Sequence, residues 1–495
     1  MNNTQLTDNP SIHSHLLLAG TARCEITNED PNVRVSDPLY AKALVLNDGK
    51  QKFVLLTVDA VSIGEICDIN DDFLPQLRTR LSDELGILAE NVLVNASHTH
   101  PPGRILCPDD ELIDRTFNVI REASQNMVEV LAGSGTGYED RISMNRNLQL
   151  KNGKQWTLRH ANPCPPEEEV VGVGPLDPEI GILRLDRLDG TPLAVVYNFA
   201  CHMLFGDTHG SITANFIGVA SNLLEEVMGH DGLAFFIQGA AGDVIDVGFK
   251  NLNQPRDVEI YGLKLAQSVL AAYQTIETGP VTLSVVNKTV DLPRRTDIPQ
   301  RIEALKKEQA DLLSSLRFNT LNFKSFLPLY LKTKLDPQHP LDYSYAYLQD
   351  TQRGRDNHSA MDAFNQDRIA TYLHGIQTME TLARMEDDIA TFERHQAIND
   401  AAGSPVAPAE FLGVKIGDCV FVSAPIEILT QVALDVKNSS PYEHTFIAAF
   451  SNGYMHYGPP AVDYDKGNYE VTECFLAPEW EQVYKATVSE IIEAL

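Results

Sequence analysis

The chain has 495 residues, with 39 Lys and Arg against 68 Asp and Glu, so its formal net charge at pH 7 is −29. Because phosphate backbones repel such a charge, nucleic acid is excluded as an expected partner. A hydrophobic content of 43% with 22% charged residues also excludes a mainly disordered chain.

The amino-terminal residues and the cysteines bear on cellular location. The first twenty residues, MNNTQLTDNPSIHSHLLLAG, hold no cationic leader and only a three-residue leucine run, too short for a signal peptide. No apolar stretch approaches the roughly 18 residues of a membrane-spanning helix. The seven cysteines form no Cys-x-x-Cys pair. We therefore expect a cytoplasmic protein without a transmembrane segment.

Short apolar segments rich in β-branched residues alternate with longer segments of helical periodicity in the first part of the chain. The predicted strands are 41–46, 53–58, 91–95, 181–185, 193–199 and 233–238. The predicted helices are 72–85, 113–131, 216–228 and 258–278. This alternation indicates an α/β fold.

The sequence pattern changes between residues 297 and 399, where charged stretches predict helices over 301–316 and 367–393. Strand patterns then return over 411–413, 418–423 and 446–450, and a closing helix is expected from 478 to 494. The sequence contains no internal repeat, and it has no flexible linker long enough to separate independent modules. We therefore expect one domain, residues 1–495, with a helical insertion over 297–399.

The sequence SHTHPPG, residues 97–103, places two histidines directly after a predicted strand. Side chains two positions apart on a strand point to the same face, so His98 and His100 can address one pocket. Imidazole nitrogen is a common zinc ligand, which favours a metal site. A pair of exposed loop histidines is the alternative interpretation.

A second histidine candidate follows the predicted strand 193–199. His202 lies just past the strand end, and His209 follows in a loop before a glycine. We prefer His202 as a metal ligand, because a strand end holds a side chain in place without relying on loop order. The alternative is a buried histidine that bonds a backbone carbonyl.

The segment IQGAAGDVID, residues 237–246, follows a buried strand with a run of small residues. Backbone amides in such a loop can hold an anion or an oxyanion, and Asp243 could orient a metal-bound histidine or a water. A tight strand-to-helix turn is the alternative.

Further oxygen donors occur after the insertion. Glu427 follows a strand within APIEIL, and FSNGYMHYGPPAVDYDKGNYE groups several tyrosines with His456. Carboxylate and phenol oxygens can bind a metal or a substrate. A glutamate at a helix start and tyrosines that only pack are the alternatives.

Taken in order, these segments resemble the neutral/alkaline (non-lysosomal) ceramidase family. The resemblance is to its catalytic N-terminal domain and to shorter bacterial proteins that lack the C-terminal immunoglobulin-like module. It runs through LLAGTARCEIT, DPLYAKALVLNDG, VLLTVDAV, VNASHTHPPG, MNRN, NFACH, QGAAGD, APIE and NGYMHYGPPAVDYDKGNYEV, and is weakest over 297–399. It implies a layered α/β sandwich with two β-sheets flanked by helices.

The resemblance also implies a zinc ion and the residues around it. The implied zinc ligands are His98, His202, Glu427 and Tyr457, a donor set that leaves room for a water that zinc can acidify. Tyr457 is preferred over Tyr454 because a second site tyrosine, Tyr469, follows it by twelve residues. We assign catalytic roles to His100, Asp243, Arg146 and Tyr469, and substrate contacts to Arg146, Tyr454 and Tyr464.

Two positions depart from the family. Ceramidases carry a serine, proposed as catalytic, in a GDVSPN-like segment, and this chain has Ile245 there. An aliphatic side chain can neither attack a carbonyl nor donate to an oxyanion, and Asp246 is the candidate general base in its place. A family acidic position before an aromatic residue is Asn215 here.

These observations favour a zinc-dependent hydrolase that uses metal-activated water on an amide, ester or related bond of a soluble small molecule. Three alternatives stay open. They are a ceramidase or other N-acyl amide hydrolase, a metal-dependent lyase or carbohydrate-processing enzyme, and a non-catalytic zinc-binding relative. Homo-oligomer formation is left open as well.

Overall fold

The computed structural model describes residues 16–64, 66, 68–100, 103–159, 164–204, 210–229, 231–248 and 257–495. The chain divides into two compact units. The sandwich unit comprises Met1–Arg295 and Ala402–Leu495, and the helical unit comprises Thr296–Ala401. Residues 297–399, predicted as a helical insertion, fall within the helical unit.

The larger sheet of the sandwich unit has eight strands in the order β12-β11-β10-β5-β1-β2-β3-β4. Their bounds are Leu17–Glu25 (β1), Tyr40–Asn47 (β2), Lys52–Val58 (β3), Val92–Ala96 (β4), Val128–Tyr138 (β5), Glu179–Arg187 (β10), Pro192–Phe199 (β11) and Leu233–Gln238 (β12). The pairs β3–β4 and β11–β12 are parallel, and the other neighbours are antiparallel. The six strands predicted in this region all form, with ends shifted by at most a few residues.

A second sheet, ordered β14-β15-β16-β18, packs on one face of the first. Its strands are Leu283–Pro293, Val406–Ile416, Cys419–Ser423 and His444–Ala448. Alternate residues of both sheets, such as Leu44 and Leu55 against Leu412 and Phe421, form the buried layer between them.

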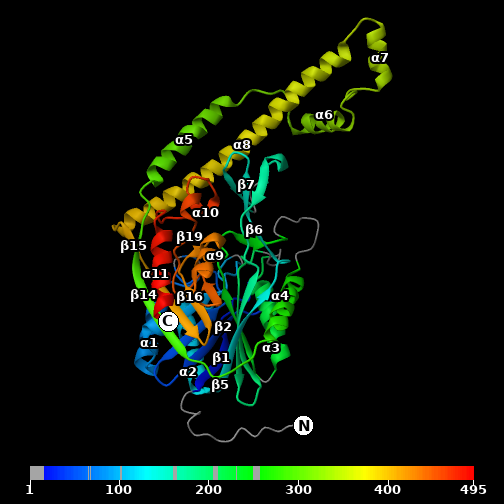
Figure 1. Ribbon diagram of the computed structural model, residues 1–495. Coiled ribbons are helices and arrows are strands. Elements are labelled where there is room, and N and C mark those ends of the chain that lie inside the picture. The colour runs from blue at the N-terminus through cyan, green and yellow to red at the C-terminus, as the bar shows by residue number, and fades with distance from the viewer. Residues whose placement is uncertain are drawn as a thin grey trace. The chain divides into compact units, whose positions relative to one another are not determined.

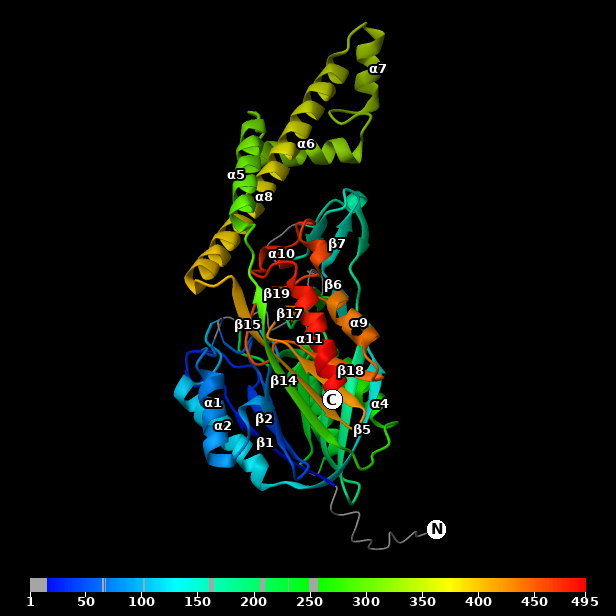
Figure 2. The same ribbon diagram turned by 60° about the vertical axis from the view of Figure 1, so that its left-hand side comes forward.

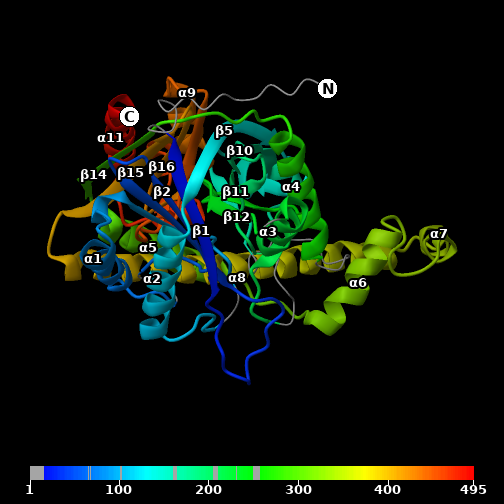
Figure 3. The same ribbon diagram turned by 90° about the horizontal axis from the view of Figure 1, so that it is seen from below.

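Helices cover the outer faces of both sheets (Figures 1 and 3). The face of the large sheet turned away from the second sheet packs on α1, α2, α3 and α4, whose bounds are Phe73–Leu85, Asp109–Gln125, Asn215–Met228 and Val258–Tyr273. The second sheet is covered by α9 (Thr430–Ser439) and α11 (Trp480–Ala494), seen together in Figure 2. The predicted layered α/β sandwich, with two sheets flanked by helices, is confirmed.

Short strands and one short helix carry the loops at one end of the sandwich. They are β6 (Ser143–Asn145) with β13 (Val244–Asp246), β7 (Asn147–Leu150) with β8 (Gln155–Thr157) and β9 (Val170–Val173), β17 (Glu427–Ile428) with β19 (Tyr457–Gly458), and α10 (Tyr469–Thr472). Most of the predicted site residues lie in or beside these short elements.

The predicted helix 113–131 is wrong at its end, because α2 stops at Gln125 and β5 begins at Val128. Glycines occupy alternate positions on one face of β5. A Cβ atom at Gly133 would lie 2.0 Å from the backbone oxygen of Glu277, so only glycine allows the chain after α4 to approach this closely. The same face of small residues lacks the apolar alternation that would have indicated a strand.

The helical unit lies in the connection between the paired ends of β14 and β15, where Pro293 is opposite Val406. Its helices are α5 (Ile298–Ser315), α6 (Phe323–Leu335), α7 (Ser344–Gln352) and α8 (Asn357–Ala402). Across both units, no helix in the described ranges combines the length and the apolar character that crossing a membrane requires.

Candidate metal centre

His98 follows β4, one edge strand of the large sheet, and His202 follows β11, which lies next to the other edge strand, β12. Buried amides fix the ends of these strands. The side-chain oxygen of Asn95, on β4, accepts a hydrogen bond from the Gln238 backbone N–H at the end of β12 (2.9 Å). The Gln238 side chain in turn donates to the Cys201 carbonyl (3.0 Å), next to His202. Two segments far apart in sequence are thereby held together below both histidines.

His98 does not lie on a strand, so the predicted alternation of His98 and His100 along one strand is wrong. β4 ends at Ala96, and His98 has a φ of 65°, in the left-handed region. Its backbone N–H donates to the Ala60 carbonyl (2.8 Å). This backbone turn, rather than the strand pleat, directs the imidazole into the buried end of the sandwich unit.

Both histidine rings are oriented by hydrogen bonds from Nδ1 to backbone carbonyls. His98 Nδ1 lies 2.7 Å from the Val61 oxygen, and His202 Nδ1 lies 2.6 Å from the Ala241 oxygen. With the proton on Nδ1, each Nε2 carries a lone pair. The carbonyl contact expected for a merely structural histidine is therefore present, and it is also the contact that prepares a histidine to bind a metal.

Glu427 and Tyr457 stand opposite each other on the short parallel pair β17–β19. Glu427 Oε2 lies 3.2 Å from His202 Nε2 and 3.7 Å from His98 Nε2. The Tyr457 hydroxyl lies 3.5 Å from His202 Nε2. All four side chains are buried. The structure thus brings together the four side chains that the family resemblance implied as zinc ligands.

The chemistry of these donors fits a cation. Glu427 Oε2 is buried and has no hydrogen-bond partner among the described residues. Burial lowers the pKa of His202 to about 3 and the pKa of His98 well below its usual value, so both rings are neutral near pH 7. The Glu427 oxygen, which lacks a donor, then faces the lone pair of His202 Nε2 at 3.2 Å, an arrangement that a divalent cation relieves.

His100 adjoins this group on its exposed side. His100 Nε2 lies 2.9 Å from His98 Nε2, and the ligand atoms of His98, His100 and His202 all lie within 4.8 Å of one another. Geometry therefore allows His100 either to bind a metal or to stand beside it as a proton donor or acceptor.

Arg146 is buried behind Tyr457. Its guanidinium donates to Glu470 Oε1 (2.7 Å), to the Gly242 carbonyl (2.7 Å) and to the Tyr457 hydroxyl (3.1 Å). Burial raises the pKa of the Tyr457 phenol and the positive charge of Arg146 opposes that rise. Arg146 thus supports negative charge on the Tyr457 oxygen.

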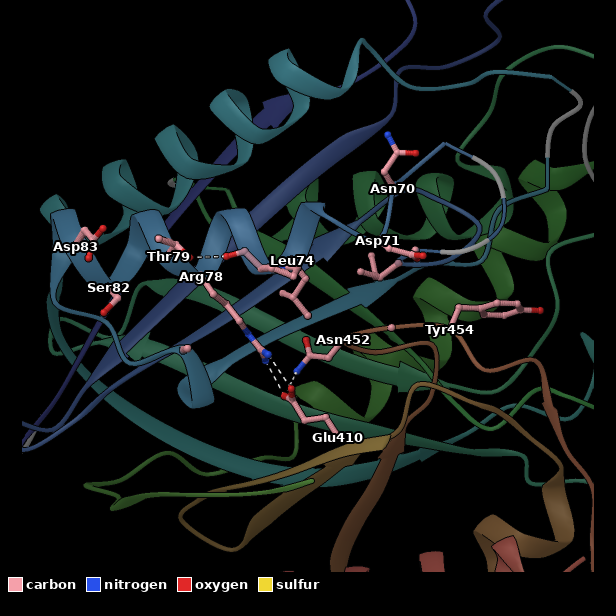
Figure 4. Close-up of a pocket in the computed structure, with 15 residues that line it drawn as sticks. Asn70, Asp71, Leu74, Arg78, Thr79, Ser82, Asp83, Glu410, Asn452 and Tyr454 are labelled. Carbon is pink, nitrogen blue, oxygen red and sulfur yellow. Dashed lines mark hydrogen bonds and ion pairs between the residues drawn. The ribbon is translucent and has the colours of Figure 1, made fainter. Parts of the chain in front are cut away.

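Tyr454 donates its hydroxyl proton to Glu427 Oε1. Its ring also closes one end of a pocket of about 710 Å³ between α1 and the loop after β18. Figure 4 shows the Tyr454 hydroxyl pointing away from the other residues that line this pocket, among them the ion pair of Arg78 with Glu410. The Tyr454 phenol therefore orients the Glu427 carboxylate, and its contact with substrate stays a prediction.

Asp243 is occupied by structural hydrogen bonds. One of its oxygens accepts from the backbone and side chain of Thr430 (2.8 and 2.7 Å), and the other accepts from the Asn145 amide (2.6 Å). Burial raises the pKa of this carboxyl to about 6. These contacts fix the small-residue loop to β6 and α9, as the turn interpretation of this segment requires.

Gly242 shows why that loop consists of small residues. A Cβ atom there would lie 2.6 Å from the Glu427 backbone oxygen, so glycine allows β17 to pass directly over the loop. Its N–H donates to the Ile428 carbonyl (3.0 Å). The Gly242 N–H therefore already has a hydrogen-bond partner within the protein, and the loop positions Glu427.

Ile245, at the position of the family serine, is fully buried on β13 and packs with Leu158. Asp246, the candidate substitute, is also fully buried, and its register partner on β6 is Ser143. The Asn215 side chain accepts a hydrogen bond from the Phe216 N–H (2.7 Å) at the start of α3. No nucleophilic hydroxyl or thiol occupies position 245.

The two remaining tyrosines differ in position. Tyr469 is half-buried, and its ring stands 5.5 Å from the Tyr457 ring with the Arg159 guanidinium 3.8 Å from its centroid. Tyr464 is buried in the core beneath α11 and donates to the Leu476 carbonyl (2.8 Å). Tyr469 thus adjoins the site, whereas the polar contacts of Tyr464 lie within the core. His209, the weaker histidine candidate, lies outside the described residues.

Glu470 and Asn95 are the important residues that sequence reasoning missed. Glu470 is fully buried and pairs with Arg146, while its other oxygen accepts from Thr157 (2.9 Å). A buried arginine requires an acidic partner, but the sequence offers 68 acidic residues and no means of choosing among them. For Asn95, its place at the end of an otherwise apolar strand was the available signal.

The fold is similar to that of two solved ceramidases. One is the crystal structure of neutral ceramidase from Pseudomonas aeruginosa, with a TM-score of 0.60 and 16% sequence identity, covering 97% of this chain and 74% of that one. The other is a ceramidase complexed with C2, with a TM-score of 0.60 and 15% identity, covering 97% and 75%. No protein-family model and no curated protein matches the sequence. At this identity the likeness establishes a shared fold.

Proposed function

We propose that this chain is a zinc-dependent hydrolase that cleaves an amide bond, with zinc held by His98, His202, Glu427 and Tyr457. The observation that carries the proposal is the unpartnered Glu427 oxygen facing two oriented imidazoles at the buried end of the sandwich unit. The ceramidase fold supports amide hydrolysis as the reaction. A bound zinc would supply Lewis acidity to a water and to the substrate carbonyl.

The protein's own residues would prepare this chemistry. The carbonyls of Val61 and Ala241 hold the two histidines in the ligand tautomer, and Tyr454 holds the Glu427 carboxylate. Arg146 stabilises negative charge on the Tyr457 oxygen. His100, exposed and in contact with His98, would move a proton between solvent and the reacting groups. Tyr469 would line the same site beside Tyr457.

The absence of a hydroxyl at position 245 favours direct attack by water over a serine nucleophile. N-acyl amides such as short-chain ceramides are the substrates to test first, followed by soluble amides and esters. Because the seven cysteines of the sequence are widely spaced and form no Cys-x-x-Cys pair, we retain the cytoplasm as the proposed compartment.

The test is hydrolysis of a short-chain N-acyl sphingosine and of soluble N-acyl amines by zinc-loaded protein, measured as released amine. We expect turnover by the wild type and by Ile245→Val, and a loss of at least about 10³-fold in kcat/KM for His202→Ala. His358→Ala, which alters an ion pair with Asp350 in the helical unit, is the matched control and should keep full activity. Equal rates for His202→Ala and the wild type would refute the proposal.

A further inference from the structure

The segment Leu316–Leu335, which includes helix α6, has a charge opposite to that of the whole chain. Its charged residues are Arg317, Lys324, Lys332 and Lys334, and it contains no Asp or Glu. In a chain of formal net charge −29, twenty consecutive residues with four positive charges and no negative one form a locally basic segment.

The same segment exposes a row of large apolar side chains. Phe323, Leu327, Leu331 and Leu335 follow one another at four-residue spacing on α6, which places them on neighbouring turns of one helix face. Their exposed fractions are 64, 39, 48 and 84%, and Phe318 just before the helix is 87% exposed. We call these five residues the apolar row.

A neighbouring side of α6 attaches the helix to its own unit. Phe326 is only 6% exposed and its ring stacks on Tyr372 of α8, with centroids 4.4 Å apart. The Asn319 side chain donates to the Arg368 carbonyl of α8 (2.7 Å). Figure 1 shows α6 as a short helix beside the long α8. Since α6 already buries one face, the apolar row is a second face that the unit's own core does not cover.

Exposed apolar rows of this size usually mark an interaction surface, and the charge selects the partner. Lysines beside an apolar row match the anionic headgroups and acyl chains of a lipid surface. Thirteen residues of helix span about 20 Å, which is too short to cross a bilayer but sufficient to lie along its interface. A second copy would oppose lysines to lysines, which disfavours self-association through this face.

We propose that α6 and the apolar row dock on the surface of membranes that contain anionic lipid. Docking would bring the protein to a lipid surface without a membrane-spanning segment. The inference goes beyond the proposed hydrolase activity and does not depend on it, because vesicle binding requires neither the metal nor turnover.

The experiment is vesicle flotation of the full-length protein with phosphatidylcholine alone and with phosphatidylcholine containing 30% phosphatidylglycerol. We expect at least about 10-fold stronger binding to the anionic vesicles at low salt, falling steeply in 0.5 M NaCl as charges are screened. The paired change Phe323→Ser with Leu331→Ser, and separately Lys324→Glu with Lys332→Glu, should each reduce binding at least about 10-fold.

Met379→Ser is the matched control, because Met379 is 55% exposed on α8 but lies outside the segment. It should bind as the wild type does, and circular dichroism should show unchanged helix content for every variant. Wild-type binding that does not distinguish the two lipid compositions, or apolar-row variants that still bind, would overturn the proposal. The proposal would also be overturned if the apolar-row variants changed the oligomeric state in sedimentation velocity and left vesicle binding unchanged.

Discussion

Glu427→Gln is expected to weaken zinc binding by more than about 100-fold and, in the metal-free protein, to raise the free energy of unfolding by about 1–3 kcal/mol. The two effects have one cause. Glu427 Oε2 is buried without a hydrogen-bond partner among the described residues, 3.2 Å from the lone pair of His202 Nε2. An amide N–H there can donate to the imidazole, whereas it cannot serve as an anionic ligand.

Zinc affinity is measured by competition with a chromophoric chelator, and stability by urea unfolding in excess chelator. Glu410→Gln is the matched control, a carboxylate that Arg78 and Asn452 already satisfy. It should lower stability whether or not metal is present and leave zinc affinity unchanged. A Glu427→Gln protein that is less stable than wild type without metal would show that the carboxylate already has a partner in the protein.

Arg146→Ala is expected to lower the free energy of unfolding of the sandwich unit by about 3–5 kcal/mol, because it leaves the fully buried Glu470 carboxylate without its cation. The loss should shrink when Glu470 is changed to Gln in the same chain, since the uncompensated charge is then removed. Arg146→Lys should lie between, because an ammonium cannot reach Glu470, Gly242 and Tyr457 together.

Unfolding can be followed by tryptophan fluorescence, since Trp156 and Trp480, the two tryptophans of the chain, both belong to the sandwich unit. Lys288→Ala, which breaks an exposed ion pair with Glu490, provides the control and should cost less than about 1 kcal/mol. If Arg146→Ala and Lys288→Ala lowered the free energy of unfolding by similar amounts, the large contribution assigned to the buried ion pair would be contradicted.

The sequence allowed most strands of the two large sheets and most helices to be predicted, because β-branched runs mark buried strands and helical spacing marks a helix with one buried face. Strands β1, β5 and β14 were not predicted. β5 was not predicted as a strand, since Gly133, Gly135 and Gly137 allow the close approach of another segment and give no apolar pattern. The family resemblance, which rests on several weak motifs in one order, implied that one zinc site would contain His98, His202, Glu427 and Tyr457.

The residues that hold this group in place were beyond the reach of the sequence. The left-handed backbone at His98 depends on a hydrogen bond to Ala60 in another segment, and the partner of Arg146, Glu470, lies 324 positions further along the chain. The hydrogen bond from Tyr454 to Glu427 was not predicted, since a tyrosine near a ligand tyrosine gives no sign of which carboxylate its hydroxyl will meet.

The most direct test of the central claim is the zinc content per chain, by inductively coupled plasma mass spectrometry, of protein purified without added metal. We predict about one zinc in the wild type, in His100→Ala and in the control His358→Ala, and almost none in His98→Ala and His202→Ala. A wild type that neither contains nor takes up zinc, or a His202→Ala protein that keeps it, would contradict the proposed metal centre.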